Sequence, residues 1–584
     1  MGLKDITSSL SLKSLDSRLD PGTDPKRIQK VSKGATKPRW NTMEFKFYYL
    51  MFAIVVPLMI NAALSATNER SPNFPRFEPL LSKGWIRGRK VDNSDSQYRF
   101  FRDNLPLLVG LVLLHSSLKK AVVGITKCQK ATFDLVFGLI FLFAAHGINA
   151  IRVLTHVLIS FAIAKCFRKR TKLAVLLTWV YGISTLFINN SYWNYPFGNI
   201  MSALSPLDTS FKGIIERWDV FYNFTLLRTL SFNMDFLEKW EEVKAGKKTV
   251  FASPAPPSKP ELKRSTSSTL ETICENGKKA VLLEERARLS APHHIQDYSL
   301  SHYIAYITYT PLFIAGPIIT FNDYLYQSQQ TLPSINRRAI IVYALRFVFC
   351  VLTMEAVLHY IYAVAVSKAK AWDGDTPFQI SMIGLFNLNI VWLKLLIPWR
   401  LFRLWALIDG IDPPENMLRC MNNNFSALAF WRAWHRSFNK WVVRYIYVPL
   451  GGSSHRILSS LAVFSFVAIW HDIELKLLLW GWLIVLFLLP EIFAQQVFSG
   501  HHKKWWYRFV RSFGAILNIW MMMIANLFGF CLGYDGTVHL IKGIFFTWSG
   551  IKFLIGANLA LFIATQVMFE QREHEKRKGV NVKC

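Results

Sequence analysis

Charged residues are scarce in this 584-residue chain. They make up 18% of it, whereas an average soluble protein has about 25%. Hydrophobic residues make up 52%. Apolar runs of about 20 residues, long enough to cross a hydrocarbon core of about 30 Å, recur along most of the sequence. This composition excludes an ordinary soluble globular protein and predicts a multi-pass membrane protein.

Cysteine is sparse and has no pattern. The seven cysteines are scattered and odd in number, with no Cys-x-x-Cys pair and no cluster of Cys with His. Because disulfide and ligand frameworks have characteristic spacings, we expect no disulfide framework, no metal site and no permanently bound cofactor. The Gly-x-Ser-x-Gly motif of serine hydrolases is also absent, so nothing points to a covalent serine intermediate.

Negative charge is the scarcer sign. The chain has 38 Asp and Glu against 68 Lys and Arg, a formal net charge of +30. No zinc-finger, RNA-recognition or helix-turn-helix pattern accompanies the cations, which flank the apolar runs. We therefore expect membrane lipids and anionic small molecules as partners, and no nucleic acid.

The chain divides into five regions by composition. Residues 1–46 are polar and lack the apolar core and cleavage site of a secretory leader, so they predict a disordered tail. Residues 47–240 are amino-terminal membrane segments, with interfacial or re-entrant pieces between 192 and 240. Residues 241–297 predict a hydrophilic, mobile loop. Residues 298–570 form the membrane core, and residues 571–584 a charged tail.

The expected fold is all-α, with roughly ten to twelve transmembrane helices plus re-entrant and interfacial helices. The apolar runs lie near residues 47–66, 104–118, 131–149, 150–166, 172–188, 299–322, 338–366, 379–398, 457–470, 475–498, 512–533 and 552–570.

The segment from Phe430 to Tyr445 has two periodic patterns. A cation recurs every four residues, and aromatic residues recur at spacings of three and four. A helix here would carry a cationic stripe and an aromatic stripe, with His435 at the edge of the aromatic face. Like charges at this spacing repel, so an anion should compensate them. Either the helix lies at the interface with its cations on lipid headgroups, or part of the stripe holds the phosphates of a cofactor such as coenzyme A.

A second feature is the end of an apolar run at Trp470, His471 and Asp472. An ionisable group at membrane depth is costly and usually faces a cavity or a partner, which makes His471 a functional candidate. The alternative is a histidine that caps the helix at the interface beside Asp472. Isolated histidines elsewhere are interpreted as satisfied core or interface residues: His115, His146, His156 and His359.

At Trp434–His435 and Trp470–His471 the sequence resembles the membrane-bound O-acyltransferase family, over about residues 40–584. Within that family it resembles the fungal branch of glycerol uptake and glycosylphosphatidylinositol (GPI) anchor remodelling. Further matching stretches are Lys90–Asp95, Tyr309–Pro317, Pro398–Trp405 and Tyr447–Gly452. The resemblance implies that the catalytic histidine is His471 and that a second, more variable catalytic position is His435. Candidates for binding substrate or cofactor around them are Arg432, Trp434, Arg436, Asn439, Lys440, Trp470 and Asp472.

The resemblance implies an acyltransferase in which His471 acts as general base. The donor would be a very-long-chain acyl-CoA as co-substrate. The acceptor would be the sn-2 hydroxyl of lysophosphatidylinositol on GPI-anchored proteins. The expected location is the endoplasmic reticulum membrane, with the plasma membrane as a further site. Two alternatives stay open: a proton-coupled polyol or glycerol transporter, and an acyltransferase that modifies proteins.

Overall fold

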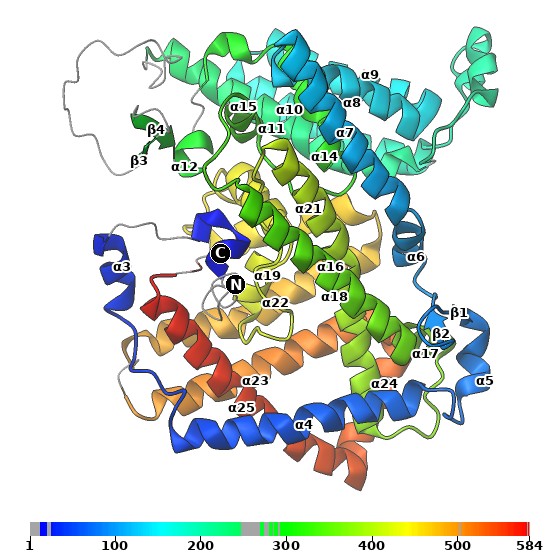
Figure 1. Ribbon diagram of the computed structural model, residues 1–584, viewed down its shortest axis with the longest axis vertical. Coiled ribbons are helices and arrows are strands. Elements are labelled where there is room, and N and C mark those ends of the chain that lie inside the picture. The colour runs from blue at the N-terminus through cyan, green and yellow to red at the C-terminus, as the bar shows by residue number, and fades with distance from the viewer. Residues whose placement is uncertain are drawn as a thin grey trace.

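Figure 1 shows the computed structural model, which describes residues 12–19, 25–215, 217–246, 269–273, 279–283, 285–289, 293–501, 504–580 and 582. Nine helical stretches in these ranges are long and apolar enough to cross a membrane. They are α4 (Met43–Thr67), α7 (Leu105–Thr126), Lys130–Cys166, α10 (Thr171–Tyr192), α16 (Arg337–Tyr360), α18 (Pro377–Asp409), most of α22 (Leu475–Val497), α23 (Tyr507–Asn526) with the π-helical η9 (Leu527–Cys531), and α25 (Trp548–Arg577).

The stretch Lys130–Cys166 contains two helices, α8 (Lys130–His146) and α9 (Ala150–Cys166), joined by the 3-10 turn η3 (Gly147–Asn149). A shorter apolar helix, α21 (Arg456–His471), lies between the longer ones. When α8 and α9 are counted separately and α21 is included, the described residues hold eleven apolar helices, within the expected ten to twelve. The all-α membrane fold is confirmed.

The helices separate into groups in Figure 1. α8, α9 and α10 lie at one end with the long α11 (Trp218–Lys244), and α4 lies at the other end with α23 and α25. α16, α18 and α21 lie between them. At the far end α25 packs on α4. Arg508 of α23 pairs with Glu44 of α4, and the backbone N–H of Thr36 donates to Glu573 of α25 at 2.9 Å.

The helix α11 differs from the interfacial or re-entrant segments predicted between residues 192 and 240. After the 3-10 turns η4 (Phe197–Asn199) and η5 (Ser202–Thr209), the chain forms one 27-residue helix that packs on α9, α10 and α13 (Leu300–Ile307). Many of its polar side chains are buried, and several have partners inside the protein: Arg228, for example, donates to the carbonyl of Ile307 at 2.9 Å. A search for apolar runs misses such a helix because its polar groups find partners within the bundle.

The apolar run at residues 299–322 does not form a span. It is divided into α13, α14 (Thr310–Phe313) and the start of α15 (Phe321–Gln329). Pro311 stands in the first turn of α14, and Pro317 follows that helix. Because proline cannot donate a helical hydrogen bond, the run ends as short buried pieces.

The signals that begin and end α18 are clear in the sequence. Thr376 and Gln379 form a capping box at its start, with Pro377 in the first turn. Gly410 ends the helix with φ 94°, a conformation that favours glycine. Residues 411–416 therefore leave the helix at a defined point, directly beside the predicted site.

The tail predicted over residues 1–46 is not disordered where the structure describes it. α2 (Leu12–Leu15) and the 3-10 turn η1 (Ser17–Leu19) pack into the protein, and Asp16 between them is 1% exposed. α3 (Pro25–Ser32) follows. The tail is polar in composition, but its charges have buried partners, which composition does not reveal.

The remaining elements are short. β1 (Leu81–Lys83) pairs with β2 (Lys90–Asp92), and β3 (Thr269–Ile273) with β4 (Lys279–Leu283), both antiparallel. Most of the predicted loop at 241–297 lies outside the described residues. The other elements are α5 (Phe74–Phe77), η2 (Glu78–Leu80), α6 (Ser96–Asp103), α12 (Glu285–Leu289), η6 (Ile295–Asp297), α17 (Ala363–Ala369), α19 (Ala427–Ala433), α20 (Arg436–Val442), η7 (Val443–Tyr447), η8 (Ser499–His501) and α24 (Gly533–Phe546).

Candidate active site

The single helix expected between residues 430 and 445 is broken at its histidine. α19 ends at Ala433 and α20 begins at Arg436. His435 caps α20 with φ 46° and ψ 55°, the left-handed region that residues other than glycine rarely adopt. Such a conformation persists only where the surroundings hold it, and it is common at functional sites.

Asn416 holds the start of α20. Its carbonyl accepts the N–H of Arg436 at 3.1 Å, and its side-chain oxygen accepts the N–H of Ser437 at 3.0 Å. The hydroxyl of Ser437 accepts the N–H of Ile318 at 2.8 Å. The first N–H groups of a helix have no partner within it, so these contacts stabilise the turn that carries His435.

The second histidine ends α21. Trp470, the residue before it, is clamped by Asn223 of α11 through two hydrogen bonds. The Asn223 amide donates to the Trp470 carbonyl at 2.8 Å, and the Trp470 indole donates to the Asn223 carbonyl at 2.9 Å. The last turn of α21, and with it the position of His471, is therefore fixed.

The two histidines, 36 residues apart in the sequence, line one cavity of about 1130 Å³. The ring of His435 stacks on Trp399 at 4.8 Å between centroids and lies 6.4 Å from the ring of Trp470. The Trp470 ring is in turn 4.7 Å from that of His471. His435 is 6% exposed, whereas His471 is exposed.

His435 is buried without its full set of partners. Its Nε2 atom has no hydrogen-bond partner within the described part of the chain. Burial, and after it the proximity of His471, lowers the pKa of His435 to about 3. The imidazole is therefore neutral near pH 7, with one nitrogen available to a ligand in the cavity.

The predicted cationic stripe divides between two environments. Arg432, Lys440 and Arg444 line the cavity. Both carboxylate oxygens of Glu285 accept from Lys440 at 2.7 Å. Burial alone would raise the pKa of Glu285, but Arg18 and Lys440 lower it to about 2. Carboxylates of the chain itself thus compensate part of the stripe.

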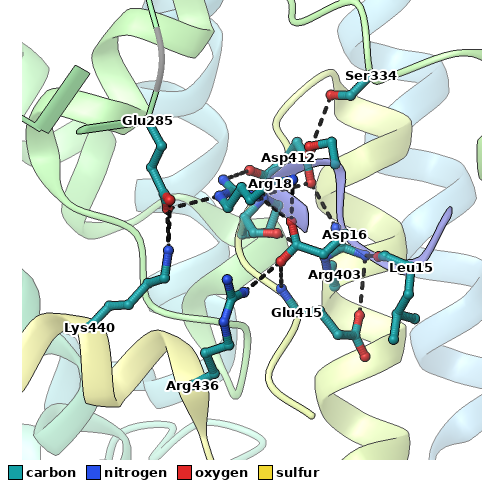
Figure 2. A network of polar contacts seen from close by, with 12 residues as sticks. Leu15, Asp16, Arg18, Glu285, Ser334, Arg403, Asp412, Glu415, Arg436 and Lys440 are labelled. Carbon is teal, nitrogen blue, oxygen red and sulfur yellow. Dashed lines mark hydrogen bonds and ion pairs between the residues drawn. The ribbon is translucent and has the colours of Figure 1, made fainter. Parts of the chain in front are cut away.

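Arg436 does not line the cavity. The residue is 5% exposed, and its guanidinium donates to Asp16 at 2.6 Å (Figure 2). Asp472 is exposed and is not among the lining residues either. The other predicted site residues all line the cavity: Arg432, Trp434, His435, Asn439, Lys440, Trp470 and His471.

Apolar and aromatic side chains form the rest of the cavity wall. They come from α11, α18, α19, α21 and α22, so helices distant in the sequence enclose one space. They include Val220, Phe224, Leu395, Leu428, Trp431, Phe464, Val467, Trp480, Leu488 and Ile492. The cavity therefore combines two histidines, an apolar wall and three basic side chains. We call these three, Arg432, Lys440 and Arg444, the cationic rim.

A profile of the membrane-bound O-acyltransferase family matches residues 173–534. The chain is also 62% identical to "Membrane-bound O-acyltransferase GUP1" of Saccharomyces cerevisiae, over 100% of both chains. The chain belongs to the membrane-bound O-acyltransferase family. It is 53% identical to GUP2 of the same yeast, over 99% of this chain and 98% of that one. A more distant relative is "Protein-cysteine N-palmitoyltransferase HHAT" of Mus musculus, 28% identical over 32% of this chain and 38% of its own.

This acyltransferase has site residues that the sequence did not identify. Asn416 and Asn223 carry no pattern of their own, and Asn223 stands in an Asn-Phe-Thr triplet typical of glycosylation. Trp399 lies in one of the stretches that resemble the family, so a signal for it was present. Asn223 and Trp399 contact Trp470 and His435, respectively, which line the cavity, and Asn416 contacts the two residues that follow His435.

Proposed function

We propose that this multi-pass acyltransferase transfers a very-long-chain fatty acyl group from acyl-CoA to a hydroxyl of a lysolipid, the sn-2 position of lysophosphatidylinositol in GPI anchors. His471 would act as the general base. The observation that carries the proposal is the meeting of two histidines, a cationic rim and an apolar wall in one cavity. An acyl-CoA has the matching parts, since it joins phosphates to a fatty chain.

The proposed reaction needs a base that faces the acceptor. The acceptor oxygen bonds to the thioester carbonyl carbon while His471 takes the hydroxyl proton. The carbon–sulfur bond then breaks, its electron pair leaves with the sulfur, and the imidazolium returns the proton to the thiolate. The products are an ester and free coenzyme A. The exposure of His471 on the cavity supports this role.

His435 suits a different task. A neutral imidazole that carries its proton on Nε2 can donate a hydrogen bond to the oxyanion that develops on the thioester carbonyl. The unpaired and buried Nε2 supports this assignment. Stacking on Trp399 keeps the ring from turning away.

The donor would lie across both parts of the cavity. We assign its phosphates to Arg432, Lys440 and Arg444 on the rim and its chain to the apolar wall. Phosphate would compete with Glu285 for Lys440. The assignment of GPI-linked lysolipid as acceptor, and of the endoplasmic reticulum as location, rests on the resemblance to the fungal branch of the family.

A protein acceptor is the second candidate. The observation that favours it is the similarity to the mouse relative named a protein-cysteine N-palmitoyltransferase. A polyol carrier remains the third alternative, since intramembrane histidines can relay protons.

The test uses purified full-length protein in detergent, with a very-long-chain acyl-CoA and lysophosphatidylinositol. We expect a diacylated product from the wild type and from His539→Ala, which changes an exposed histidine of α24, and none from a folded His471→Ala variant. Acylation of a peptide instead of the lysolipid would favour the second candidate. Glycerol uptake by reconstituted vesicles without acyl-CoA, together with no acyl transfer, would establish the carrier.

A further inference from the structure

The segment formed by α2 and η1 lies near α20, and its charged side chains reach Arg436 and, through Glu285, Lys440 of that helix (Figure 2). Leu15 packs in a small cluster with Tyr343 and Leu407, and its carbonyl accepts from Arg403 at 3.0 Å. Asp16 is 1% exposed. A polar amino-terminal segment is thus built into the interior, where each charge needs a partner.

Asp16 contacts the residue that follows His435. One of its carboxylate oxygens accepts from the Arg436 guanidinium at 2.6 Å and from the backbone N–H of Glu415 at 3.1 Å. The other oxygen accepts the backbone N–H of Arg18 at 3.0 Å. Charge-assisted contacts of this kind are strong and directional, so Asp16 fixes the position of both partners.

These two partners flank the turn that carries His435. Arg436 is next to His435 in the chain, and Glu415 is next to Asn416, which accepts the first N–H groups of α20. Asp16 therefore joins the side chain after the histidine to the loop that caps its helix. The left-handed conformation of His435 depends on such external support.

Arg18 reaches a second point on the same helix. Its Nε atom donates to Glu285 at 2.8 Å, and Glu285 in turn accepts from Lys440 of α20. Its Nη2 atom donates to the Asp412 carbonyl at 2.6 Å. Figure 2 shows both routes to α20, one from Arg18 through Glu285 to Lys440 and one from Asp16 to Arg436.

We propose that residues 15–18 form an amino-terminal latch and that Asp16 is a positioning residue, which holds α20 so that His435 keeps its place on the cavity. The proposal rests on the proposed catalytic role of the cavity. In the described structure, Asp16 makes hydrogen bonds outside its own segment with the Arg436 side chain and the Glu415 backbone, neither of which lines the cavity. Asp16 would therefore act on the reaction through the chain segments that carry His435 and Asn416.

The first test compares Asp16→Asn with Lys33→Ala, which changes an exposed residue of the same tail. We expect Asp16→Asn to lower kcat by about 10- to 100-fold, because a misplacement of about 1 Å has effects of this size. The KM for acyl-CoA should stay within about threefold, since no cavity side chain is removed. Lys33→Ala should match the wild type.

A double variant separates positioning of His435 from a purely structural role of Asp16, in which the two losses of kcat would multiply. If Asp16 acts through His435, adding Asp16→Asn to a His435→Ala protein should lower kcat by less than about twofold more. If the two losses multiply in the double variant, or if Asp16→Asn retains the wild-type kcat, the latch is refuted.

A folding failure is addressed by Asp16→Glu, which keeps the charge beside Arg436 but lengthens the side chain by one methylene. This variant should remain folded and lose about 3- to 10-fold in kcat through displacement of α20. Full activity in a folded Asp16→Glu protein would contradict the latch. If the wild type transfers no acyl group to any acceptor, the proposed function fails instead. If His471→Ala is inactive as expected while both Asp16 variants match Lys33→Ala, the latch fails alone.

Discussion

Two regions of this acyltransferase contain charged or titratable groups, and the two regions differ in how these groups find hydrogen-bond partners. On the membrane helices, Lys119 contacts Asp134 at 2.6 Å and Asp409 at 2.7 Å, and the hydroxyls of Tyr324 and Tyr309 donate to the same two carboxylates. Around the cavity, Nε2 of His435 has no partner in the described structure, and His471 is exposed. In the first region, the closed region, the charged groups are partners of one another. In the second, the open region, a nitrogen without a partner is left for a ligand.

The comparison refines the rule that an ionisable group within the membrane marks a functional site. His115 accepts the indole N–H of Trp405 at 3.0 Å, and His156 contacts both Tyr181 and Asn189. Nε2 of His146 lacks a partner in the described residues, but His146 does not line the cavity of His435 and His471. Of these histidines, only the proposed catalytic pair, His435 and His471, lines the cavity.

Substitution of the cavity histidines should have the largest effect. We expect His471→Ala to lower kcat by about 10² to 10⁴, the usual contribution of general acid–base catalysis. The His435→Ala/His471→Ala double variant should be no slower than the slower single variant, because residues that act as a unit are not additive. Single-turnover acyl transfer measures this, and losses that multiply would separate the histidines into two independent sites.

Breaking the closed region should affect stability and not chemistry. Lys119→Met leaves two carboxylates without their cation, so the free energy of unfolding should fall by about 3–5 kcal/mol. The kcat per folded molecule should be that of the wild type. Chemical unfolding in detergent gives the first quantity and active-site titration the second. A lower kcat with unchanged stability would place Lys119 in the reaction and remove the contrast.

The titration of His435 should make the stability of the protein depend on pH. The pKa of His435 is lowered to about 3 in the folded protein, while an unfolded histidine has about 6.5. The unfolded state therefore takes up a proton first, so the stability associated with His435 is complete above about pH 6.5 and is lost as the pH falls toward 3. From about pH 7 to pH 5 the wild type should lose about 2 kcal/mol relative to His435→Gln. Parallel unfolding curves for the two proteins would contradict the neutral imidazole.

The smallest effect should come from the cationic rim. Lys440→Met should raise the KM for acyl-CoA about tenfold, equivalent to about 1.4 kcal/mol. The control is Lys542→Met, an exposed lysine of α24. Glu285→Gln should act in the opposite direction, because it releases Lys440 from its carboxylate partner. An unchanged KM in all three variants would show that Lys440 serves only its ion pair.

Much of the fold could be predicted because membrane spans are encoded locally. Runs such as 379–398 and 552–570 appear as parts of α18 and α25, since length and hydropathy decide whether a helix can cross. α11 could not be found in this way because its polar side chains are satisfied by distant residues. The break at His435 was also invisible, since the charge and aromatic periods continue through it.

For the site, the sequence indicated which residue types are present but not which partner or cavity each side chain contacts. Arg436 belongs to the same periodic stripe as Arg432 and Lys440, yet its partner is Asp16, 420 residues away in the chain. Contacts at such separations depend on the whole topology, which no local pattern contains. The cavity itself is likewise a product of packing among α11, α18, α19, α21 and α22.

The contact between α4 and α25 has a consequence for biogenesis. The ribosome delivers α4 to the membrane long before it makes α25, so the buried face of α4 first meets lipid or an insertion factor instead of its native partner. The pairing of Glu44 with Arg508 and of Thr36 with Glu573 can form only late in synthesis. A nascent chain stalled before α23 would therefore lack both of these pairings.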